Sequence, residues 1–161
     1  YLHALKDSNK KTNGKSKVPV ASEVLPGWWV GGRYGHLLDK DWAGTIDLTV
    51  EFPEMCINRT EKYMLVASWD GVPPSPELLE EAATFAAEAR KRGDVMIHCA
   101  HGRGRSTTVM CAALVKAGEV STWEEAIKVI QKGRPVCKLN GMMRMALTEW
   151  QTTYVDGKKG V

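Results

Sequence analysis

Apolar residues along this chain fall into short continuous runs and into longer runs with helical spacing. The short runs at 28–32, 45–50, 63–67 and 95–98 predict four strands. The run at 95–98 is almost entirely apolar, which is typical of a strand covered on both faces. Strands and helical segments alternate, so the sequence predicts an α/β fold with a central, mostly parallel, twisted sheet flanked by helices.

The first two helical segments carry clear start and stop signals. Ser75 is a good N-cap for the first, because Pro76 follows it in the first turn, where the missing N–H costs nothing. Apolar residues then recur at helical spacing until Gly93 ends the run. A second helix is predicted over residues 104–117.

Two more helices are predicted in the last third of the chain. Ser121 and Glu124 form a capping box for the third, which ends near Lys132. The fourth begins near Asn140 and is expected to turn four residues toward the core: Met142, Met145, Ala146 and Trp150.

Length and composition indicate one globular domain. The chain has 161 residues, 43% of them hydrophobic and 25% charged, and no apolar run approaches the length of a membrane span. We expect a basic, flexible N-terminal segment at 1–20, a folded domain at 21–156 and a short tail at 157–161. Because the first residue is Tyr1, we also expect the sequence to be a piece of a longer protein.

The basic charge is confined to the N-terminal segment. Residues 1–17 hold five lysines against one aspartate, whereas the other 144 residues hold 17 basic and 18 acidic groups. A globally basic nucleic-acid binder is therefore not expected. The segment is predicted to be either a disordered linker or a polybasic contact to an anionic membrane.

The four cysteines show no zinc-ligand spacing. Cys99 follows an apolar strand and Cys111 lies in an apolar helical run, positions that suit reduced thiols. We therefore expect a cytosolic or other reducing compartment. Whether a second cysteine forms a disulfide with Cys99 stays open at this level.

Residues 98–106 join the fourth predicted strand directly to the second predicted helix. Such a strand, tight loop and helix surround one point with backbone N–H groups and place the positive helix end behind it, which makes an anion site. The residues expected to line this phosphate-binding loop are Ala100, His101, Gly102, Arg103 and Gly104. The loop from Cys99 to Arg105 is called the Cys99 loop below.

Cys99 is the candidate nucleophile of this loop. A helix N-terminus with nearby cations favours the reactive thiolate, Arg105 can hold two phosphoryl oxygens, and the Ser106 hydroxyl can hydrogen-bond the sulfur. A single cysteine here would more often be a buried, inert thiol, but the complete pattern favours catalysis. A metal site built from His98, Cys99 and His101 is not expected, because adjacent strand residues point to opposite faces.

Displacement of an alkoxide or phenoxide also needs a proton donor. The candidate is Asp70, which lies in a loop after an apolar strand and is followed by Gly71 and two prolines. An Asp in such a loop is often only a turn former. Together with the Cys99 loop, it favours a general acid.

These residues resemble the dual-specificity branch of the protein tyrosine phosphatases, whose motif is His-Cys, five residues, then Arg-Ser or Arg-Thr. The resemblance extends over roughly 25–154 and includes Asp70, Arg134-Pro135 and Asn140. It implies a phosphatase fold and two steps: Cys99 takes the phosphoryl group with Asp70 as acid, and water then hydrolyses the phosphocysteine with Asp70 as base. It also implies that His98 orients the cysteine, and that no metal or other cofactor is needed.

The loop leaves the substrate open. His101 and Arg103 add basic character, and the run from Gly102 to Val109 is similar to lipid-directed members such as the mitochondrial phosphatidylglycerophosphate phosphatases, as is Glu51-Phe52-Pro53-Glu54. Those enzymes usually have Lys-Ala after the cysteine, whereas this chain has Ala100-His101. We expect phosphoproteins as substrates, with phosphoinositides or phosphatidylglycerophosphate as the alternative.

A different class of function is a pseudo-enzyme that binds phosphorylated partners without turnover. The combined presence of Cys99, Arg105 and Asp70 argues against it, because binding alone needs no thiol. We expect a monomer whose partners are a phosphorylated protein or a phospholipid, with membrane contact, if any, through the N-terminal lysines.

Overall fold

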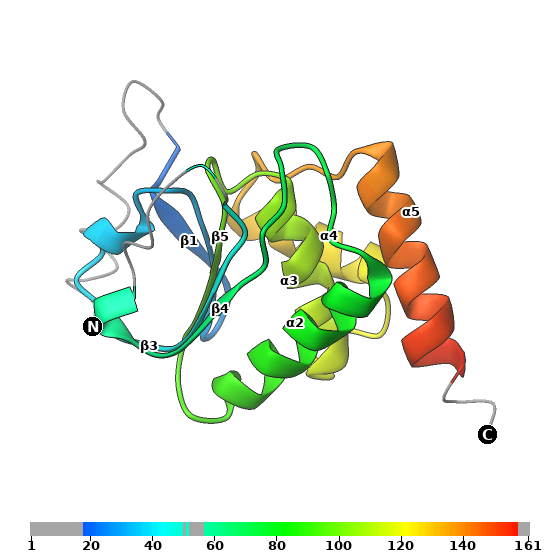
Figure 1. Ribbon diagram of the computed structural model, residues 1–161, viewed down its shortest axis with the longest axis horizontal. Helices are drawn as coiled ribbons and strands as arrows, with labels where there is room; N and C mark the ends of the chain where they lie inside the picture. Colours follow the sequence, from blue (N-terminus) through cyan, green and yellow to red (C-terminus); the bar gives the residue numbers. More distant parts are fainter. Residues whose placement is uncertain (1–17, 50, 52–56, 158–161) are drawn as a thin grey trace.

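The computed structural model describes residues 18–49, 51 and 57–157. Within them a sheet packs one face against a layer of helices (Figure 1). The strands are β1 (Ala21–Leu25), β2 (Trp28–Gly31), β3 (Trp42–Asp47), β4 (Thr60–Leu65) and β5 (Val95–His98). The helices are α2 (Pro76–Arg90), α3 (Arg105–Lys116), α4 (Trp123–Gly133) and α5 (Gly141–Trp150), with short helical turns η1 (Gly35–Leu37), η2 (Ile57–Arg59) and η3 (Gln151–Asp156).

The strand order is β1-β2-β5-β3-β4, and every pairing except that of β1 with β2 is parallel. The predicted α/β fold with a mostly parallel sheet is therefore confirmed. The order places β5 in the middle of the sheet, so the segment after His98 leaves from the centre of its carboxyl edge. That edge is where parallel α/β sheets place their ligand sites.

The four predicted strands are present, with shifted bounds. The run predicted at 45–50 is a strand over Trp42–Asp47, and the one predicted at 63–67 lies at Thr60–Leu65. Strand β1 was not predicted. Its half-buried residues Ser22 and Glu23 interrupt the apolar pattern, because β1 is an edge strand that pairs only with β2.

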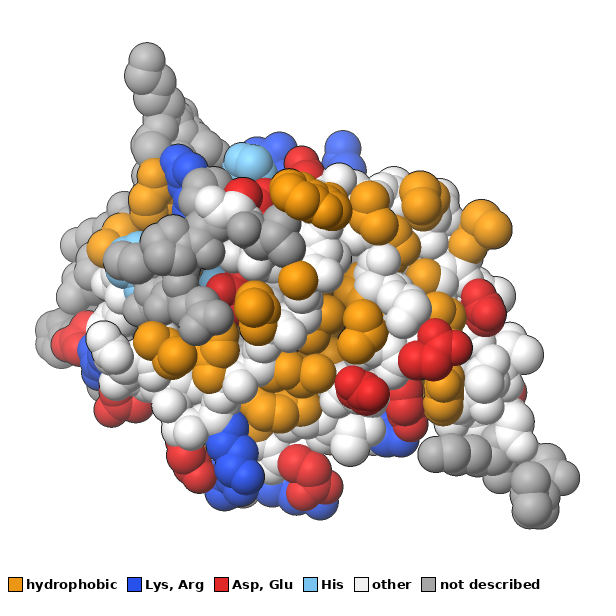
Figure 2. Space-filling model, in the orientation of Figure 1, with side chains coloured by type: hydrophobic (Ala, Val, Ile, Leu, Met, Phe, Trp, Pro, Cys, Tyr) orange, Lys and Arg blue, Asp and Glu red, His pale blue; other side chains and the backbone are white. Residues whose placement is uncertain are grey.

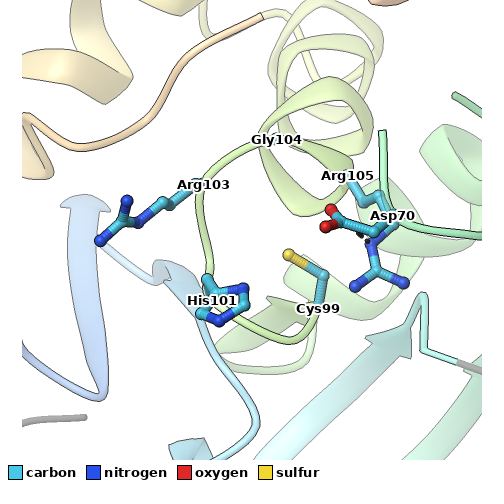
Figure 3. A pocket seen from close by; sticks show the side chains of 6 residues that line it. All are labelled: Asp70, Cys99, His101, Arg103, Gly104 and Arg105. Carbon is cyan, nitrogen blue, oxygen red and sulfur yellow. Dashed lines mark ion pairs between the residues drawn. The ribbon is translucent and has the colours of Figure 1, made fainter. Parts of the chain in front are cut away.

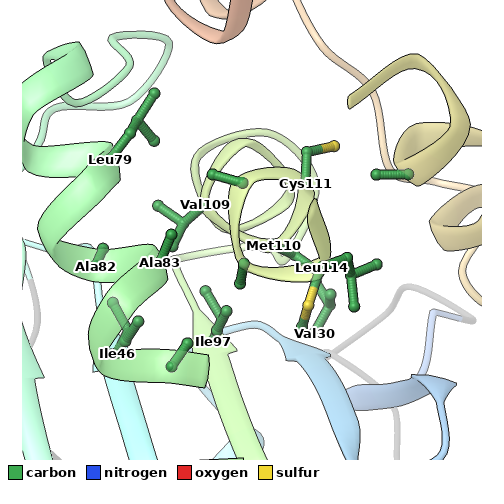
Figure 4. Close-up of a cluster of buried hydrophobic side chains, with 14 of the residues drawn as sticks. Val30, Ile46, Leu79, Ala82, Ala83, Ile97, Val109, Met110, Cys111 and Leu114 are labelled. Carbon is green, nitrogen blue, oxygen red and sulfur yellow. The ribbon is translucent and has the colours of Figure 1, made fainter. Parts of the chain in front are cut away.

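Strand β5 is buried on both faces, as its composition predicted. Val95 and Ile97 belong to the main core, where the side chains of α2 and α3 meet the sheet (Figure 4). Met96 points the other way, into a smaller cluster that includes Trp29 and Trp42. Successive side chains of a strand point to opposite faces of the sheet, which explains this division. Packing on both faces holds β5 in place where the Cys99 loop begins.

The helix starts follow the predicted signals, with one shift. The Ser75 side chain accepts a hydrogen bond from the backbone N–H of Leu78, as an N-cap should. The cap of α4 is Thr122 and not Ser121, because Thr122 accepts from Glu125 while the Glu125 carboxylate accepts from the Ser121 backbone. The capping-box prediction was therefore displaced by one residue.

The predicted inner face of α5 was partly wrong. Ala146 and Trp150 are buried, but Met142 is 57% exposed and Met145 is 73% exposed. The buried methionine is Met143, which packs with the main core. The helix begins where it was predicted, but the face packed on the core consists of Met143, Ala146, Leu147 and Trp150.

The folded part begins before residue 21. Val20 is fully buried and its carbonyl accepts a hydrogen bond from the backbone N–H of Gly32. Most of the expected N-terminal segment, residues 1–17, and the final residues 158–161 lie outside the described residues. Among the helices that the structure describes, none is both long and apolar enough to cross a bilayer.

Candidate active site

The Cys99 loop connects β5 to α3 at the floor of a pocket of about 350 Å³. Six residues line this pocket: Asp70, Cys99, His101, Arg103, Gly104 and Arg105 (Figure 3). The Cys99 backbone N–H donates to the Gly31 carbonyl at 3.1 Å, so the β2–β5 ladder continues to the cysteine. Gly104 is the N-cap of α3 and has no side chain to cap the helix, which leaves the helix N-terminus open toward the pocket.

The backbone carbonyls of the Cys99 loop are bound from outside the pocket. The Ala100 carbonyl accepts from the Arg33 backbone at 2.9 Å, and the Arg103 carbonyl accepts from the Lys138 backbone at 2.9 Å and from Thr107 Oγ1 at 2.8 Å. A peptide unit that turns its carbonyl outward turns the following N–H inward. The backbone N–H groups from Ala100 to Gly104 have no acceptor among the described residues, so they are available to an anion in the pocket.

Arg134 binds the middle of the loop from behind. Its Nε donates to the Gly102 carbonyl at 2.8 Å and one terminal nitrogen donates to the His101 carbonyl at 3.2 Å. The other terminal nitrogen donates to the Pro19 carbonyl and to Ser22 Oγ, both at 2.8 Å. The guanidinium is buried, so it joins β1 to the loop and adds a positive charge beneath it.

Gly102 is required at its position for two reasons. Its φ is +63°, a conformation that side chains disfavour. An added Cβ would also lie 2.7 Å from the Gly31 carbonyl carbon and 2.8 Å from Arg134. Gly102 was expected from sequence to allow the backbone angles of the loop. It also leaves the space in which β2 and Arg134 approach the loop backbone.

The cysteine sulfur contacts a hydroxyl from the next helix. Cys99 is 3% exposed, and its Sγ lies 3.3 Å from Ser106 Oγ. In this pair the Cys99 thiol donates its hydrogen to the Ser106 hydroxyl. When the sulfur is a thiolate, only the Ser106 hydroxyl can donate. Sequence placed these two residues together, and the structure does so.

Arg105 is buried and held by an acidic partner. Its terminal nitrogens donate to the two oxygens of Glu51 at 2.9 and 3.2 Å, and one of them donates to the Ser68 carbonyl at 2.9 Å. Its buried Nε has no acceptor within the described residues and lies 3.9 Å from Asp70 Oδ1. The guanidinium is thus oriented, with one N–H still unused beside the pocket.

Asp70 lies at the pocket mouth with its side chain 81% exposed (Figure 3). Its loop turns at Gly71, which has a φ of +80°. Asn140 fixes that turn: its Nδ2 donates to the Gly71 carbonyl at 2.9 Å, and its Oδ1 caps α5 by accepting from the Met143 backbone at 2.9 Å. One amide side chain therefore joins the loop that carries Asp70 to the start of α5.

His98 is buried beside a carboxylate that the sequence analysis did not select. Asp47 pairs with His98 across β3 and β5, and its Oδ1 lies 3.9 Å from His98 Nδ1. The carboxylate accepts from the Thr49 backbone, from the Thr49 hydroxyl and from Tyr63. Burial lowers the pKa of His98, and the charge of Asp47 only partly opposes this, so the imidazole is neutral.

The two other basic residues of the loop lie differently. His101 and Arg103 are both exposed. Figure 3 shows His101 beside Cys99, whereas the Arg103 side chain extends away from the sulfur. Arg103 is thus placed to meet a group outside the innermost pocket. Of the acidic segment considered with them, Glu51 binds Arg105, and residues 52–54 lie outside the described part.

A second thiol contacts the Cys99 loop. Cys137 is buried, and its Sγ lies 3.6 Å from the Gly102 carbonyl. Burial raises the pKa of both Cys137 and Cys111, so these thiols stay protonated and are weak nucleophiles. Cys99, Cys111 and Cys137 are all free, and Cys56 lies outside the described residues.

Four residues outside the motif shape the site, and the sequence analysis gave none of them a role of its own in it. Glu51, Arg134 and Asn140 were noticed only as part of the resemblance, and Asp47 not at all. A charged residue inside an apolar strand was a signal for Asp47. Arginine is usually exposed, so nothing local indicated that Arg134 is buried. Within the described residues there is no group of three or more His, Cys, Asp or Glu side chains placed to hold a metal.

Comparison with known proteins agrees with this geometry. The family model "Dual specificity phosphatase, catalytic domain" matches residues 44–153. Dual specificity protein phosphatase 12 of Mus musculus is 29% identical over 131 residues, which are 74% of this chain and 38% of that protein. The chain spans only part of such curated relatives, from 16% of the MAP kinase phosphatase with leucine-rich repeats protein 3 of Dictyostelium discoideum to 57% of the dual specificity protein phosphatase 15 of Mus musculus.

Solved structures show the same fold. A mouse putative dual specificity phosphatase complexed with zinc tungstate superposes with a TM-score of 0.75 at 20% identity, over 92% of this chain and 96% of that one. PTPMT1 in complex with PI(5)P gives a TM-score of 0.68 at 20% identity, over 86% and 99% of the two chains.

The buried imidazole of His98 predicts a pH-dependent stability. The pKa of His98 is lower in the folded protein than its ordinary value of 6.5, so on acidification the unfolded chain binds this proton first. Above pH 6.5, His98 should therefore not reduce the free energy of unfolding. Below pH 6.5, protonation of His98 in the unfolded chain should lower the free energy of unfolding by up to about 1.4 kcal/mol per pH unit. Urea unfolding between about pH 7 and about pH 5.5 measures the slope.

His98→Gln is the matched variant, because it removes the titrating group and keeps a similar polar shape. Its absolute stability should be lower, but its slope over the same pH interval should be smaller than that of the wild type. Parallel slopes in the two proteins would contradict the assignment of a neutral, buried His98.

Proposed function

The chain belongs to the dual specificity phosphatase catalytic-domain family, and we propose that it hydrolyses the phosphate monoesters of phosphotyrosine, phosphoserine and phosphothreonine proteins through a phosphocysteine intermediate. The main support is the loop geometry: the Cys99 sulfur lies at the floor of a pocket lined by unused backbone N–H groups, with Asp70 and Arg105 in the same wall. An anion bound by those N–H groups is held over the sulfur.

In the first step the Cys99 thiolate attacks phosphorus. The P–S bond forms while the bond from phosphorus to the ester oxygen breaks, and Asp70 in its acid form gives that oxygen its proton. The loop N–H groups and Nε of Arg105 bind the equatorial oxygens, whose charge is greatest in the transition state. Glu51 supports this step by holding the guanidinium in one orientation.

In the second step water attacks the phosphocysteine. The Asp70 carboxylate accepts a proton from the water as the new P–O bond forms, and the P–S bond breaks to return the thiolate. The Ser106 hydroxyl, 3.3 Å from the sulfur, donates to the departing thiolate. Both steps are written with backbone and side-chain groups of this chain and with water. Because Cys99 must stay reduced, we place the enzyme in a reducing compartment.

A second candidate substrate is a phospholipid headgroup. Arg103 extends away from Cys99 at the pocket wall, where it can meet a second negative group while the scissile phosphate lies over the sulfur. The fold of PTPMT1, solved with PI(5)P, is similar to this one. A binding function without turnover is less well supported, because it explains neither the sulfur nor Asp70 at the pocket.

The mechanism predicts two variants with different signatures. Cys99→Ser should abolish hydrolysis of aryl phosphates, with EDTA present throughout, because an alcohol at this position is a far weaker nucleophile. Asp70→Asn should lower turnover about a hundredfold or more for esters with poor leaving groups, and less for those with good ones. Full activity of Cys99→Ser, or equal losses on all leaving groups for Asp70→Asn, would refute these roles.

A substrate panel separates the two candidates. Phosphotyrosine, phosphoserine and phosphothreonine peptides are compared with phosphatidylinositol monophosphates and phosphatidylglycerophosphate by phosphate release. Phosphoprotein activity predicts higher kcat/KM on the peptides, and Arg103→Gln should leave it nearly unchanged. Higher kcat/KM on the lipids, lost in Arg103→Gln, would favour the second candidate instead.

Asn140 is predicted to position the general acid. In Asn140→Ser the hydroxyl can still cap α5, but it is too short to reach the Gly71 carbonyl. Stability should therefore stay near that of the wild type, while turnover of poor leaving groups falls about tenfold, part of the general-acid contribution. Good leaving groups should be affected much less.

The matched control for Asn140→Ser is Thr122→Ser, which alters an N-cap of the same kind on α4. It should change neither stability nor turnover appreciably. If Asn140→Ser loses activity equally on good and poor leaving groups, its effect does not pass through Asp70.

A further inference from the structure

Four exposed apolar side chains form a rim beside the pocket mouth. They are Trp69 (68% exposed), Val72 (43%), Met142 (57%) and Met145 (73%). Figure 2 shows apolar side chains gathered along one edge of the molecule, over α5 and the segment before α2. The first two flank Asp70 and Gly71 in the pocket wall, and the others lie on the first two turns of α5. These four residues are called the apolar rim.

The two halves of the apolar rim are joined to each other. Asn140 donates to the Gly71 carbonyl while capping α5, and the Val72 backbone N–H donates to the Trp69 carbonyl at 3.0 Å. These hydrogen bonds fix the backbone that carries one half of the apolar rim relative to the backbone that carries the other. It lies next to the mouth through which a substrate reaches Cys99.

Packing inside the protein does not require these side chains to be apolar. Helix α5 packs on the core through Met143, Ala146, Leu147 and Trp150. Its exposed residues Met142 and Met145 are therefore not needed for packing. Trp69 likewise differs from Trp28, Trp29, Trp42 and Trp150, which are at most 3% exposed. Large apolar side chains gathered on a surface indicate a partner that covers them.

The charges around the rim indicate what that partner is. Arg103, Lys138 and Arg144 are exposed, and none forms an ion pair within the described part of the chain. Lys138 is attached to the Cys99 loop through its backbone bond to the Arg103 carbonyl, and Arg144 stands between Met142 and Met145 on α5. The Asp70 carboxylate, between Trp69 and Val72 in the chain, lies 3.9 Å from Nε of Arg105, so the three cations outside that pair favour a partner that accepts tryptophan and methionine side chains and carries negative charge.

We propose that the apolar rim docks this domain onto the surface of an anionic phospholipid bilayer. Tryptophan and flexible apolar side chains enter the interface between headgroups and acyl chains, while the three cations meet lipid phosphates. A stable protein partner would bury about 800 Å² on each side, more than a ridge of four side chains supplies. A bilayer needs no matching shape. The docked orientation brings the pocket mouth to the membrane surface.

This inference goes beyond the proposed function, because it concerns where the domain works and not what it cleaves. It also uses residues other than the N-terminal lysines, through which membrane contact was expected from sequence. Its test measures binding without hydrolysis, so a failure of the phosphatase proposal and a failure of docking can be told apart.

The experiment uses the full chain and sedimentation with vesicles of phosphatidylcholine, alone or mixed with phosphatidylglycerol. Met142→Ser/Met145→Ser should bind the mixed vesicles about tenfold more weakly than the wild type, because exposed methionines no longer insert. Its hydrolysis of a soluble aryl phosphate and its circular dichroism should not change. Leu37→Ser, which alters an exposed apolar side chain outside the rim, is the matched control and should bind like the wild type.

Tryptophan fluorescence supplies an independent readout. Brominated phosphatidylcholine in the same vesicles should quench the wild type, and Trp69→Phe should lose that quenching while still binding. Both proteins carry the N-terminal lysines, so these cannot explain a difference. Equal binding by wild type and the double methionine variant, no quenching, or no binding to any vesicle would each overturn the proposal, the last pointing to a protein partner.

Discussion

The structure of the site depends on a buried arginine that holds the Cys99 loop open from behind. Arg134 gives its N–H groups to carbonyls of His101 and Gly102 on one side and to Pro19 and Ser22 on the other. Burial lowers its pKa, and the charge of a Cys99 thiolate opposes that shift. A buried cation is costly unless its donors are satisfied, and here four hydrogen bonds to a planar fork satisfy it. The same hydrogen bonds hold the carbonyls of His101 and Gly102 turned away from the pocket.

With its carbonyls occupied, the loop directs its N–H groups at one point. The same arrangement explains why Gly102 has no room for a side chain, since Gly31 and Arg134 approach it from the other side. The position of β5 in the middle of the sheet supports the loop from below. Anion binding is thus a property of the backbone, and the side chains of Cys99 and Arg105 add the chemistry.

Two further contacts bring distant parts of the chain to that point. Glu51 follows β3 and orients Arg105, and Asn140 before α5 fixes the loop that carries Asp70. The first contact reaches the catalytic Arg105 itself, and the second reaches Gly71, the residue next to the catalytic Asp70. The second also joins the segment that carries Trp69 and Val72 to the start of α5, so the contact that positions the general acid also connects the two halves of the apolar rim. Catalytic geometry and the proposed membrane surface therefore share one polar link.

The sequence by itself determined the α/β class, the strand–loop–helix unit around Cys99 and the pairing of the sulfur with Ser106, because these depend on local spacing and on period. It predicted the Ser75 cap for the same reason. Tertiary structure decided what depends on contacts between distant segments. The packing of α5 against the core turned Met143 inward and left Met142 and Met145 exposed. The edge position of β1 hid it from the apolar pattern, and the burial of Arg134 and Asp47 followed from neighbours up to 115 residues away, which no local pattern records.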